Sequence, residues 1–350
     1  MTAIDRLIVF APNWLGDAVM ALPAIADVRQ AFREAQLGIA ARAGLAALFE
    51  AVPGVDAVVR LNGQGWRAQR RDCDAIRAGS WNAALLLPNS FHAAWLAWRS
   101  GIGQRWGYRS DLRSMLLTRA VRKPSRARRH QAEYYQALTR ALDIPSGPLT
   151  PRVHVDDRVR ASAGHLLRAA GWRDEPLVGL GPGAAYGSAK QWLPQRMGVL
   201  ASRLQREHHT RVVVVGSVED VDAARAVVES AEQSGAPLGS VINVAGRTTL
   251  AQLMGVLVHC TAFVSNDSGA MHLAAALDVP VTAIFGATRE WATSPLPGPA
   301  AHAPAIVHAD VFCRPCMLRT CPIDHRCMTR IGVDEVLAPV LRSLSPHSAA

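Results

Sequence analysis

The chain has 350 residues, of which 49% are hydrophobic and 19% charged, a balance that is typical of folded globular domains and excludes a disordered chain. Its net charge of +10 favours an acidic partner: a nucleic acid, an anionic membrane or a phosphorylated substrate. No apolar run approaches the roughly 20 residues that a membrane-spanning helix needs. The N-terminal stretch resembles a first β-strand and not a signal peptide, so we expect a cytoplasmic protein.

Strands and helices alternate through the first half of the chain. A Pro- and Gly-rich stretch at residues 143–151 then indicates a linker. We therefore expect an N-terminal domain at 1–150 and a C-terminal domain at 151–350. In the first half we expect strands at 6–10, 57–61 and 83–87, and helices at 18–33, 41–50, 66–78 and 131–142.

The second half repeats this alternation. Strands alternating with helices favour a parallel sheet covered on both faces. The sequence therefore predicts an α/β protein with two Rossmann-like, doubly wound domains facing across a cleft. In the second half we expect strands at 177–180, 211–215, 241–243, 261–264 and 279–285, and helices at 158–170, 194–206, 219–233 and 248–258, with one more directly after residue 266.

A polar turn between the strand at 261–264 and an Ala-rich helix holds Asp267, Ser268 and Gly269. Unpaired N–H groups at a helix N-terminus bind phosphate well, and Gly269 lets a ligand approach the backbone. His272 lies four positions after Ser268, on the same helix face. We expect a phosphorylated ligand here; the alternative is that Asp267 and Ser268 only cap the helix.

A glycine-rich loop at 181–192 follows the strand at 177–180 and includes Gly183, Ser188 and Lys190. Several glycines with a lysine indicate a phosphate cradle, in which Lys190 is a point charge on a diphosphate. The loop is not a Walker A motif, because the lysine does not directly follow the last glycine and no Ser or Thr follows it. A surface lysine on an exposed loop is the alternative.

Gly16 and Asp17 lie between the first strand and the helix expected to begin at Ala18. A carboxylate at this place can act as a general base in an interdomain cleft. A helix N-terminus keeps such a carboxylate ionised at neutral pH. The alternative is an aspartate that only caps the helix.

Two further loops follow strands at the edge where open α/β sheets bind ligands. Asn89 and Ser90 follow the strand at 83–87, and Glu219 and Asp220 follow the strand at 211–215. An acid at the second place can hold ribose hydroxyls. Glu219 is the first choice for that role and Asp220 competes with it, while capping of the next helix is the alternative for both.

The sequence offers no clear metal site. The pairs Asp72/Asp74 and Asp220/Asp222 fall in expected helices, where residues two apart point away from each other. Four cysteines lie in the segment 313–327, where structural zinc, a disulfide and reduced thiols are the alternatives. These cysteines are Cys313, Cys316, Cys321 and Cys327.

A strongly basic run lies between Arg119 and His130. Such a run is commonly a solvated surface, and contact with an anionic acceptor or membrane is the functional alternative. A basic nucleic-acid-binding protein with a Cys-rich zinc module is the rival from another class. Aromatic residues do not interleave the basic run and no groove-reading helix is evident, so we expect no nucleic-acid partner.

Taken together, the motifs resemble the ADP-heptose:LPS heptosyltransferases of glycosyltransferase family 9, and are most similar to the type II members. The resemblance spans nearly the whole chain and depends on the order and spacing of the motifs. The motifs are Asn13-Trp14-Leu15-Gly16-Asp17 with Leu22-Pro23, Leu87-Pro88-Asn89-Ser90-Phe91, Pro182-Gly183-Ala184 with Ala189-Lys190-Gln191-Trp192, Ser265-Asn266-Asp267-Ser268-Gly269 with His272, and the Cys-rich tail.

The resemblance implies a GT-B fold and an inverting glycosyltransferase of lipopolysaccharide core biosynthesis that needs no metal or other cofactor. It would transfer L-glycero-D-manno-heptose from ADP-heptose to the first heptose of the Kdo2-lipid A inner core, at the cytoplasmic face of the inner membrane. Asp17 would be the base and Lys190 would stabilise the departing diphosphate. Gly16, Asn89, Ser90, Gly183, Ser188, Glu219, Asp267, Ser268, Gly269 and His272 would bind substrates. A sibling transferase with another acceptor remains the alternative.

Overall fold

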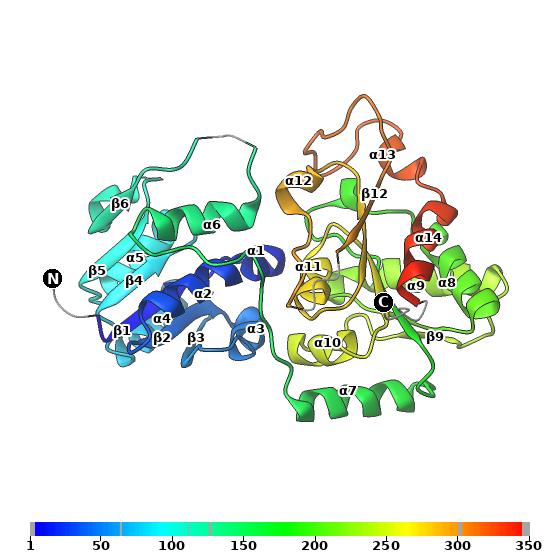
Figure 1. The fold of residues 1–350 in the computed structure, drawn as a ribbon, viewed down its shortest axis with the longest axis horizontal. Helices are drawn as coiled ribbons and strands as arrows, with labels where there is room; N and C mark the ends of the chain where they lie inside the picture. Colours follow the sequence, from blue (N-terminus) through cyan, green and yellow to red (C-terminus); the bar gives the residue numbers. More distant parts are fainter. Residues whose placement is uncertain (1–3, 64, 111, 126–127, 300–302, 345–350) are drawn as a thin grey trace, which may run out of the picture. The chain divides into compact units, whose positions relative to one another are not determined.

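The computed structural model describes residues 4–63, 65–110, 112–125, 128–299 and 303–344. The chain packs into two compact units, residues 1–154 and residues 155–350 (Figure 1). Each unit has its own sheet and its own hydrophobic core. Within the described ranges, none of the helices combines the length and apolar character required to cross a bilayer.

The first unit contains one parallel six-stranded sheet, in the order β3-β2-β1-β4-β5-β6. Helices pack beside it in pairs, α2 with α6 and α4 with α5. Its elements are β1 Arg6–Phe10, α1 Leu15–Met20, α2 Leu22–Ala31, β2 Gln36–Arg42, α3 Ala46–Glu50, β3 Ala57–Leu61, α4 Trp66–Ala78, β4 Ala83–Leu86, α5 Phe91–Arg99, β5 Gln104–Tyr108, β6 Arg119–Val121 and α6 Gln131–Arg140.

The second unit also contains one parallel six-stranded sheet, in the order β12-β11-β10-β7-β8-β9. Two 3₁₀ helices, η3 Ser188–Lys190 and η4 Val218–Asp220, follow β7 and β8. The other elements are α7 Asp157–Ala169, β7 Leu177–Gly181, α8 Pro194–His208, β8 Arg211–Val214, α9 Val221–Gln233, β9 Val241–Asn243, α10 Leu250–Leu257, β10 Ala262–Asn266, α11 Gly269–Ala276, β11 Val281–Phe285, α12 Glu290–Thr293, β12 Ala305–His308, α13 Arg326–Thr329 and α14 Val333–Leu344.

Both sheets have the strand order of a doubly wound Rossmann-like fold, 3-2-1-4-5-6 when the strands of each unit are numbered in turn. In each unit the first three strands are added toward one edge of the sheet and the last three toward the other edge. The strand order therefore reverses between β1 and β4 in the first unit and between β7 and β10 in the second. Loops that leave the carboxyl ends of these strands form the usual ligand site of such sheets. The expected α/β class with two Rossmann-like units, as in GT-B proteins, is confirmed.

Several expected elements were wrong in the first unit. The helix expected at 18–33 is two helices, α1 and α2, because Pro23 starts a new helix in its first turn. The helix expected at 41–50 begins only at Ala46, since residues 36–42 form β2. In the second unit, the expected helices and strands between residues 157 and 285 agree with the structure to within two residues.

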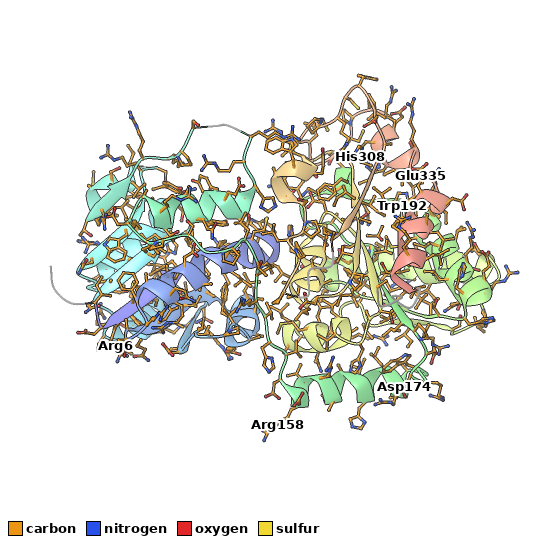
Figure 2. The ribbon with its side chains drawn as sticks, in the orientation of Figure 1. Arg6, Arg158, Asp174, Trp192, His308 and Glu335 are labelled. Carbon is orange, nitrogen blue, oxygen red and sulfur yellow. The ribbon has the colours of Figure 1, made fainter. Side chains whose placement is uncertain are left out.

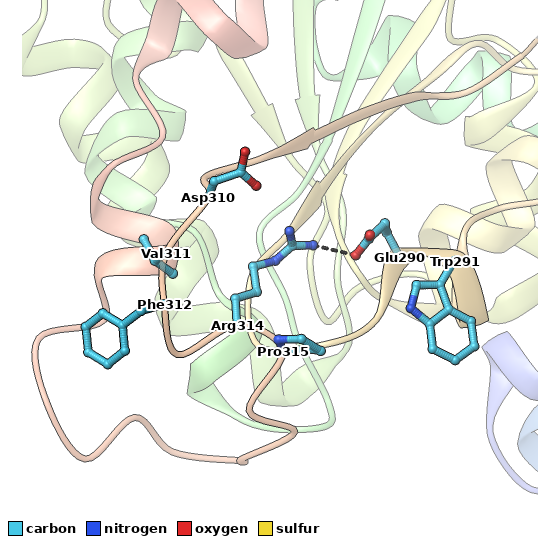
Figure 3. Close-up of a pocket in the computed structure, with 7 residues that line it drawn as sticks. All are labelled: Glu290, Trp291, Asp310, Val311, Phe312, Arg314 and Pro315. Atoms are coloured by element: carbon cyan, nitrogen blue, oxygen red, sulfur yellow. Dashed lines mark hydrogen bonds and ion pairs between the residues drawn. The ribbon is translucent and has the colours of Figure 1, made fainter. Parts of the chain in front are cut away.

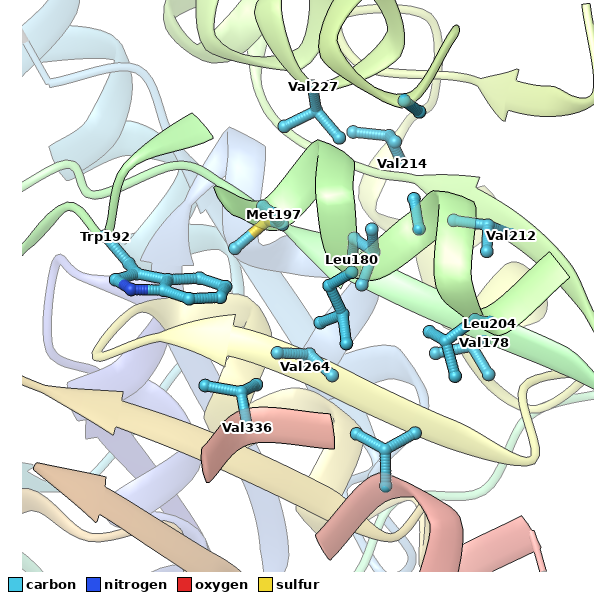
Figure 4. Packing of buried hydrophobic residues seen from close by; sticks show 14 of the residues in the cluster. Val178, Leu180, Trp192, Met197, Leu204, Val212, Val214, Val227, Val264 and Val336 are labelled. Atoms are coloured by element: carbon cyan, nitrogen blue, oxygen red, sulfur yellow. The ribbon is translucent and has the colours of Figure 1, made fainter. Parts of the chain in front are cut away.

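The core of the second unit fixes the loop after β7. Trp192 is fully buried and packs among the side chains of β7, β10, α8 and α14 (Figure 4). It lies inside the unit, whereas charged side chains such as Arg158 and Asp174 are exposed at its outside (Figure 2). The Trp192 indole N–H donates to the carbonyl of Ile331 at 3.1 Å, so the end of this loop is anchored where it enters α8.

Candidate active site

In the second unit, a buried asparagine joins the loops that follow β7 and β10. The Asn266 side-chain oxygen accepts from the backbone N–H of Trp192 at 2.9 Å. Its amide nitrogen donates to the carbonyl of Pro182 at 2.8 Å. The glycine-rich loop and the start of α11 are therefore held side by side where the chain direction across the sheet reverses.

The centre of this site is an ion pair between Lys190 and Asp267, with 2.6 Å between Nζ and Oδ2. The Lys190 side chain is 12% exposed and that of Asp267 is 4% exposed. The Thr288 hydroxyl donates to the same Oδ2 at 2.6 Å. Asp267 thus fixes the ammonium of Lys190, which also lies 4.7 Å from the centre of the Tyr186 ring.

Helix α11 begins beside this pair. Ser268 is its N-cap, and its hydroxyl accepts from the backbone N–H of Met271 and bonds the hydroxyl of Ser265 at 2.9 Å. Gly269 opens the helix, and His272 lies buried within it. Ser268 therefore acts as a cap, and the site combines a lysine with the positive end of a helix dipole.

The two acids after β8, Glu219 and Asp220, differ in their hydrogen bonds and in their exposure to solvent. The Asp220 carboxylate accepts from the Ser217 backbone N–H at 2.8 Å and hydroxyl at 2.7 Å. A Cβ on Gly183 would lie 2.3 Å from that carboxylate, so Asp220 packs directly on the glycine-rich loop. Glu219 is exposed, and its hydrogen bond with Ser217 lowers the pKa of its carboxyl.

The Cys-rich segment 313–327 packs on the glycine-rich loop, which the sequence did not indicate. The Ala189 N–H donates to the Arg319 carbonyl at 3.0 Å, and the Tyr186 hydroxyl donates to the Met317 carbonyl at 2.7 Å. Ser188 is exposed between these contacts. The segment thus supports the loop that presents Lys190.

All six cysteines are free thiols. The sulfur of Cys321 accepts from the backbone N–H of His325 at 3.3 Å, and burial raises the pKa of Cys327. In the ranges that the structure describes, no three His, Cys, Asp or Glu side chains are placed to hold a metal ion. This geometry gives the zinc and disulfide interpretations of the segment no support.

In the first unit, Gly16 and Asp17 lie inside α1 and not in the loop before it. The N-cap of α1 is Trp14, so the interpretation of Asp17 as a simple helix cap is wrong. Asp17 is half-buried in the first turn of the helix. Its carboxylate therefore lies where α1 leaves the carboxyl end of β1.

The Asp17 carboxylate has a partner that the sequence did not indicate. Tyr135, a buried residue of α6, hydrogen-bonds Asp17 and Gln131 through its side chain. Burial, and then the negative charge of Asp17, raise the pKa of the Tyr135 phenol far above its usual range. The phenol is therefore neutral, and its O–H group donates a hydrogen bond to the Asp17 carboxylate.

Hydrogen bonds from neighbouring side chains hold the loop after β4 in place. Asn89 donates to the hydroxyl of Tyr134 at 2.9 Å, and Ser90 is the N-cap of α5. Arg113 is fully buried and donates to the carbonyls of Tyr108 and Pro88. These bonds satisfy backbone groups that a loop next to the core would otherwise leave unpaired.

A small pocket of about 70 Å³ opens at this edge of the first sheet. Asn13 after β1, Arg42 at the end of β2, and Ser90 with His92 at the start of α5 are among its lining residues. Arg42 and His92 were missed in the sequence, because β2 was missed and a single histidine after a strand gives no motif. The pocket combines hydrogen-bonding groups with one positive side chain, Arg42, and one negative side chain, the buried Asp72, so it suits a polar substrate.

Comparison with known proteins identifies the family of the chain. The family model for glycosyltransferase family 9 (heptosyltransferase) matches residues 70–326. The chain is 30% identical over 305 residues to lipopolysaccharide heptosyltransferase 2 of Salmonella typhimurium, covering 83% of this chain and 85% of that protein. It is 30% identical over 304 residues to the enzyme of the same name from Escherichia coli K12, with the same coverage.

Solved structures show the same fold. The structure of E. coli ADP-heptose LPS heptosyltransferase II matches with a TM-score of 0.82 at 27% identity, covering 97% of this chain and 98% of that one. E. coli heptosyltransferase WaaC with ADP matches with a TM-score of 0.71 at 16% identity, covering 97% and 99%. The chain is a glycosyltransferase and belongs to glycosyltransferase family 9, the heptosyltransferase family.

Proposed function

We propose that the chain transfers L-glycero-D-manno-heptose from ADP-heptose to the first heptose of the Kdo2-lipid A inner core, with inversion and without a metal ion. The name that the two 30% identical relatives share supports this choice of sugar and glycolipid. The single observation that carries the proposal is the Lys190 ammonium, fixed by Asp267 at the start of α11.

The second unit is the donor domain in this proposal. Negative charge develops on ADP as the bond between the diphosphate and the sugar breaks. A preorganised lysine and a helix N-terminus aimed at that charge stabilise the transition state. Gly183, Ser188, Gly269 and His272 complete the donor site, and exposed Glu219 binds the ribose hydroxyls.

The first unit is the acceptor domain in this proposal. Asp17 takes the proton of the attacking hydroxyl as that oxygen bonds to the anomeric carbon, and Asn89 and Ser90 bind the acceptor. We propose that the enzyme is cytoplasmic and contacts the inner membrane peripherally. Exposed Arg122 and Lys123 in the basic run would attract the anionic headgroups; Arg126 and Ala127 of that run lie outside the described residues.

Mass spectrometry of lipopolysaccharide from a deletion strain tests this proposal. We expect a core truncated after one heptose, and restoration of the full core by the intact gene. A core truncated elsewhere would instead identify a sibling transferase with another acceptor. An unchanged core, together with salt-dependent DNA retention and no ADP binding, would favour the nucleic-acid-binding rival.

Tyr135→Phe tests how the base is positioned. A hydrogen bond to a charged group contributes about 1.5–3 kcal/mol, so we expect kcat to fall about tenfold to a hundredfold while the KM for ADP-heptose stays unchanged. Tyr108→Phe is the matched control, since Tyr108 is also buried and its hydroxyl donates only to a backbone carbonyl, that of Tyr134. Equal kcat values for the two variants in steady-state assays would refute a positioning role for Tyr135.

A further inference from the structure

Helix α5 of the first unit presents aromatic side chains to solvent. Phe91, Trp95 and Trp98 follow one another at intervals of four and three residues, so they share one face of the helix. Ala93 and Leu96, on the other side of the helix, are buried. Phe91 is 44% exposed and Trp98 is 49% exposed. A grouped set of exposed apolar side chains indicates an interaction surface.

A second group of exposed apolar side chains follows β5. Leu112 is 87% exposed, and Met115 in the 3₁₀ helix η2 Arg113–Leu116 is 82% exposed. Because η2 packs on α5, the two groups lie on neighbouring elements. Leu112 has a φ of +56°, a left-handed conformation that bulky residues rarely adopt. Strain of this kind is common at functional sites.

Hydrogen bonds connect this second group to the loop after β4, which holds the proposed acceptor residues. The Ser110 hydroxyl donates to the Asn89 carbonyl at 2.6 Å. The buried guanidinium of Arg113 donates to the carbonyls of Pro88 and Ser90. The exposed apolar side chains are therefore fixed next to the acceptor loop, within the first unit alone.

The chain around these side chains is strongly basic. Between residues 91 and 130, Asp111 is the only acidic residue in the sequence. Arg99 at the end of α5, and Arg122 and Lys123 after β6, are exposed. In the part of the chain that the structure describes, these three side chains form no ion pair. Their charges are therefore available to an anionic partner.

A pocket of the second unit shows the opposite arrangement. This pocket has a volume of about 450 Å³, and Arg314 lies in its wall beside Trp291 (Figure 3). The Arg314 guanidinium pairs with Glu290, with 2.6 Å between Nη2 and Oε2. An anionic ligand would have to compete with Glu290 for Arg314, whereas the cations near α5 have no such competitor.

We propose that the first unit docks on an anionic phospholipid bilayer through these exposed apolar side chains. The inference rests on the proposed function, because it takes the acceptor to be a glycolipid anchored in a membrane. The apolar side chains enter the boundary between headgroups and acyl chains, and the neighbouring cations attract the headgroups. The docking surface consists of Phe91, Trp95, Trp98, Leu112 and Met115.

This surface adds an apolar component to the electrostatic attraction of the basic run. Membrane affinity increases both with the apolar area that is buried and with the attraction of cations to anionic lipid. Docking would hold the acceptor loop at the surface in which the lipid anchor of the acceptor stays. The docking surface thereby serves access to the acceptor and takes no part in bond breaking.

Co-sedimentation of the full chain with lipid vesicles, in the absence of any acceptor, tests the docking surface. We expect vesicles of phosphatidylethanolamine and phosphatidylglycerol to bind the chain about tenfold more tightly than vesicles of phosphatidylcholine. In Leu112→Asn/Met115→Gln the affinity for the anionic vesicles should fall about tenfold to hundredfold, because two apolar side chains no longer enter the bilayer. Asparagine tolerates the left-handed conformation at position 112, so the fold should persist.

Leu238→Asn is the matched control for the change at Leu112, because Leu238 is 88% exposed in the second unit. Its vesicle affinity should equal that of the unaltered chain. Arg122→Gln/Lys123→Gln should lower the affinity for anionic vesicles about tenfold and leave binding to phosphatidylcholine unchanged. Equal vesicle affinities of Leu238→Asn and the apolar double variant would overturn the inference.

Analytical ultracentrifugation tests the other possible occupant of the surface, a second copy of the chain. The unaltered chain and Leu112→Asn/Met115→Gln should sediment alike in the absence of lipid. A change in oligomeric state without a change in vesicle affinity would overturn the inference, because the surface would then be an interface between copies.

Transfer assays separate this inference from the proposed function. With a de-acylated, soluble acceptor, the apolar double variant should keep kcat and both KM values within about twofold. With the complete acceptor in vesicles, its transfer rate should fall about tenfold. An equal loss on both acceptors would overturn the inference, because Leu112 and Met115 would then serve the acceptor sugar.

The two proposals can fail independently. Vesicle binding that does not depend on Leu112 and Met115 would overturn the docking surface even if heptose transfer is confirmed. If the chain transfers heptose to neither acceptor while its vesicle binding depends on Leu112 and Met115, the proposed function would be overturned and the docking surface supported.

Discussion

Asp17→Asn is expected to lower kcat by a factor of about 10²–10⁴, the usual contribution of a general base. The amide has the shape of the carboxylate but cannot take the proton of the attacking hydroxyl. The side chain remains beside Tyr135, which can still donate its hydroxyl to the amide oxygen. The fold should therefore persist, and the loss should be confined to the chemical step.

Two measurements on this variant separate catalysis from binding. Calorimetry should show an unchanged affinity for ADP, because the proposed diphosphate site lies wholly in the second unit. Asp74→Asn, which changes an exposed aspartate of α4 that pairs with Arg77, should keep full activity. An Asp17→Asn enzyme with normal kcat would rule out the base role.

Lys190→Met is expected to lower kcat by about 10²–10³, comparable to the loss of one preorganised donor in other transition-state sites. It should also destabilise the second unit by about 3–5 kcal/mol, because Asp267 is left as a buried charge without its cation. The Thr288 hydroxyl alone does not neutralise that charge. Arg168→Met, which breaks the exposed pair with Asp174 in the same unit, should leave the stability nearly unchanged, because water screens an exposed ion pair.

The double variant Lys190→Met/Asp267→Asn distinguishes the two effects of Lys190. Removing both charges relieves the buried carboxylate, so chemical denaturation should show most of the lost stability restored. The transfer rate should stay low, because no cation faces the departing diphosphate. If activity returned together with stability, Lys190 would have only a structural role.

The fold was largely predictable because most strands are short apolar runs bounded by glycine, proline or polar turns. The runs Leu177–Gly181 and Val281–Phe285 are of this kind, and both are buried along their whole length. β2 was missed because its sequence, QLGIAAR, is rich in alanine and glycine, which have low β-propensity. It forms a strand because it pairs with β1 and β3 on either side, which sequence periodicity does not show.

The residues of the candidate site could be predicted only where they lie in a recognisable sequence pattern. Lys190 lies in a glycine-rich loop and Ser268 starts a helix, and both patterns are visible in the sequence. The pairing of Lys190 with Asp267 depends on the neighbouring positions of β7 and β10 in the sheet. Tyr135 contacts Asp17 only through the packing of α6 against α1, so no sequence motif marks it.

The most direct test incubates the purified chain with ADP-heptose and a lipid A-core acceptor that ends in its first heptose, in the presence of a metal chelator. We expect the acceptor to gain one heptose by mass spectrometry, with one ADP released per transfer and inverted anomeric configuration by NMR. An acceptor left unmodified while the donor stays intact, or transfer that stops when the chelator is added, would contradict this account.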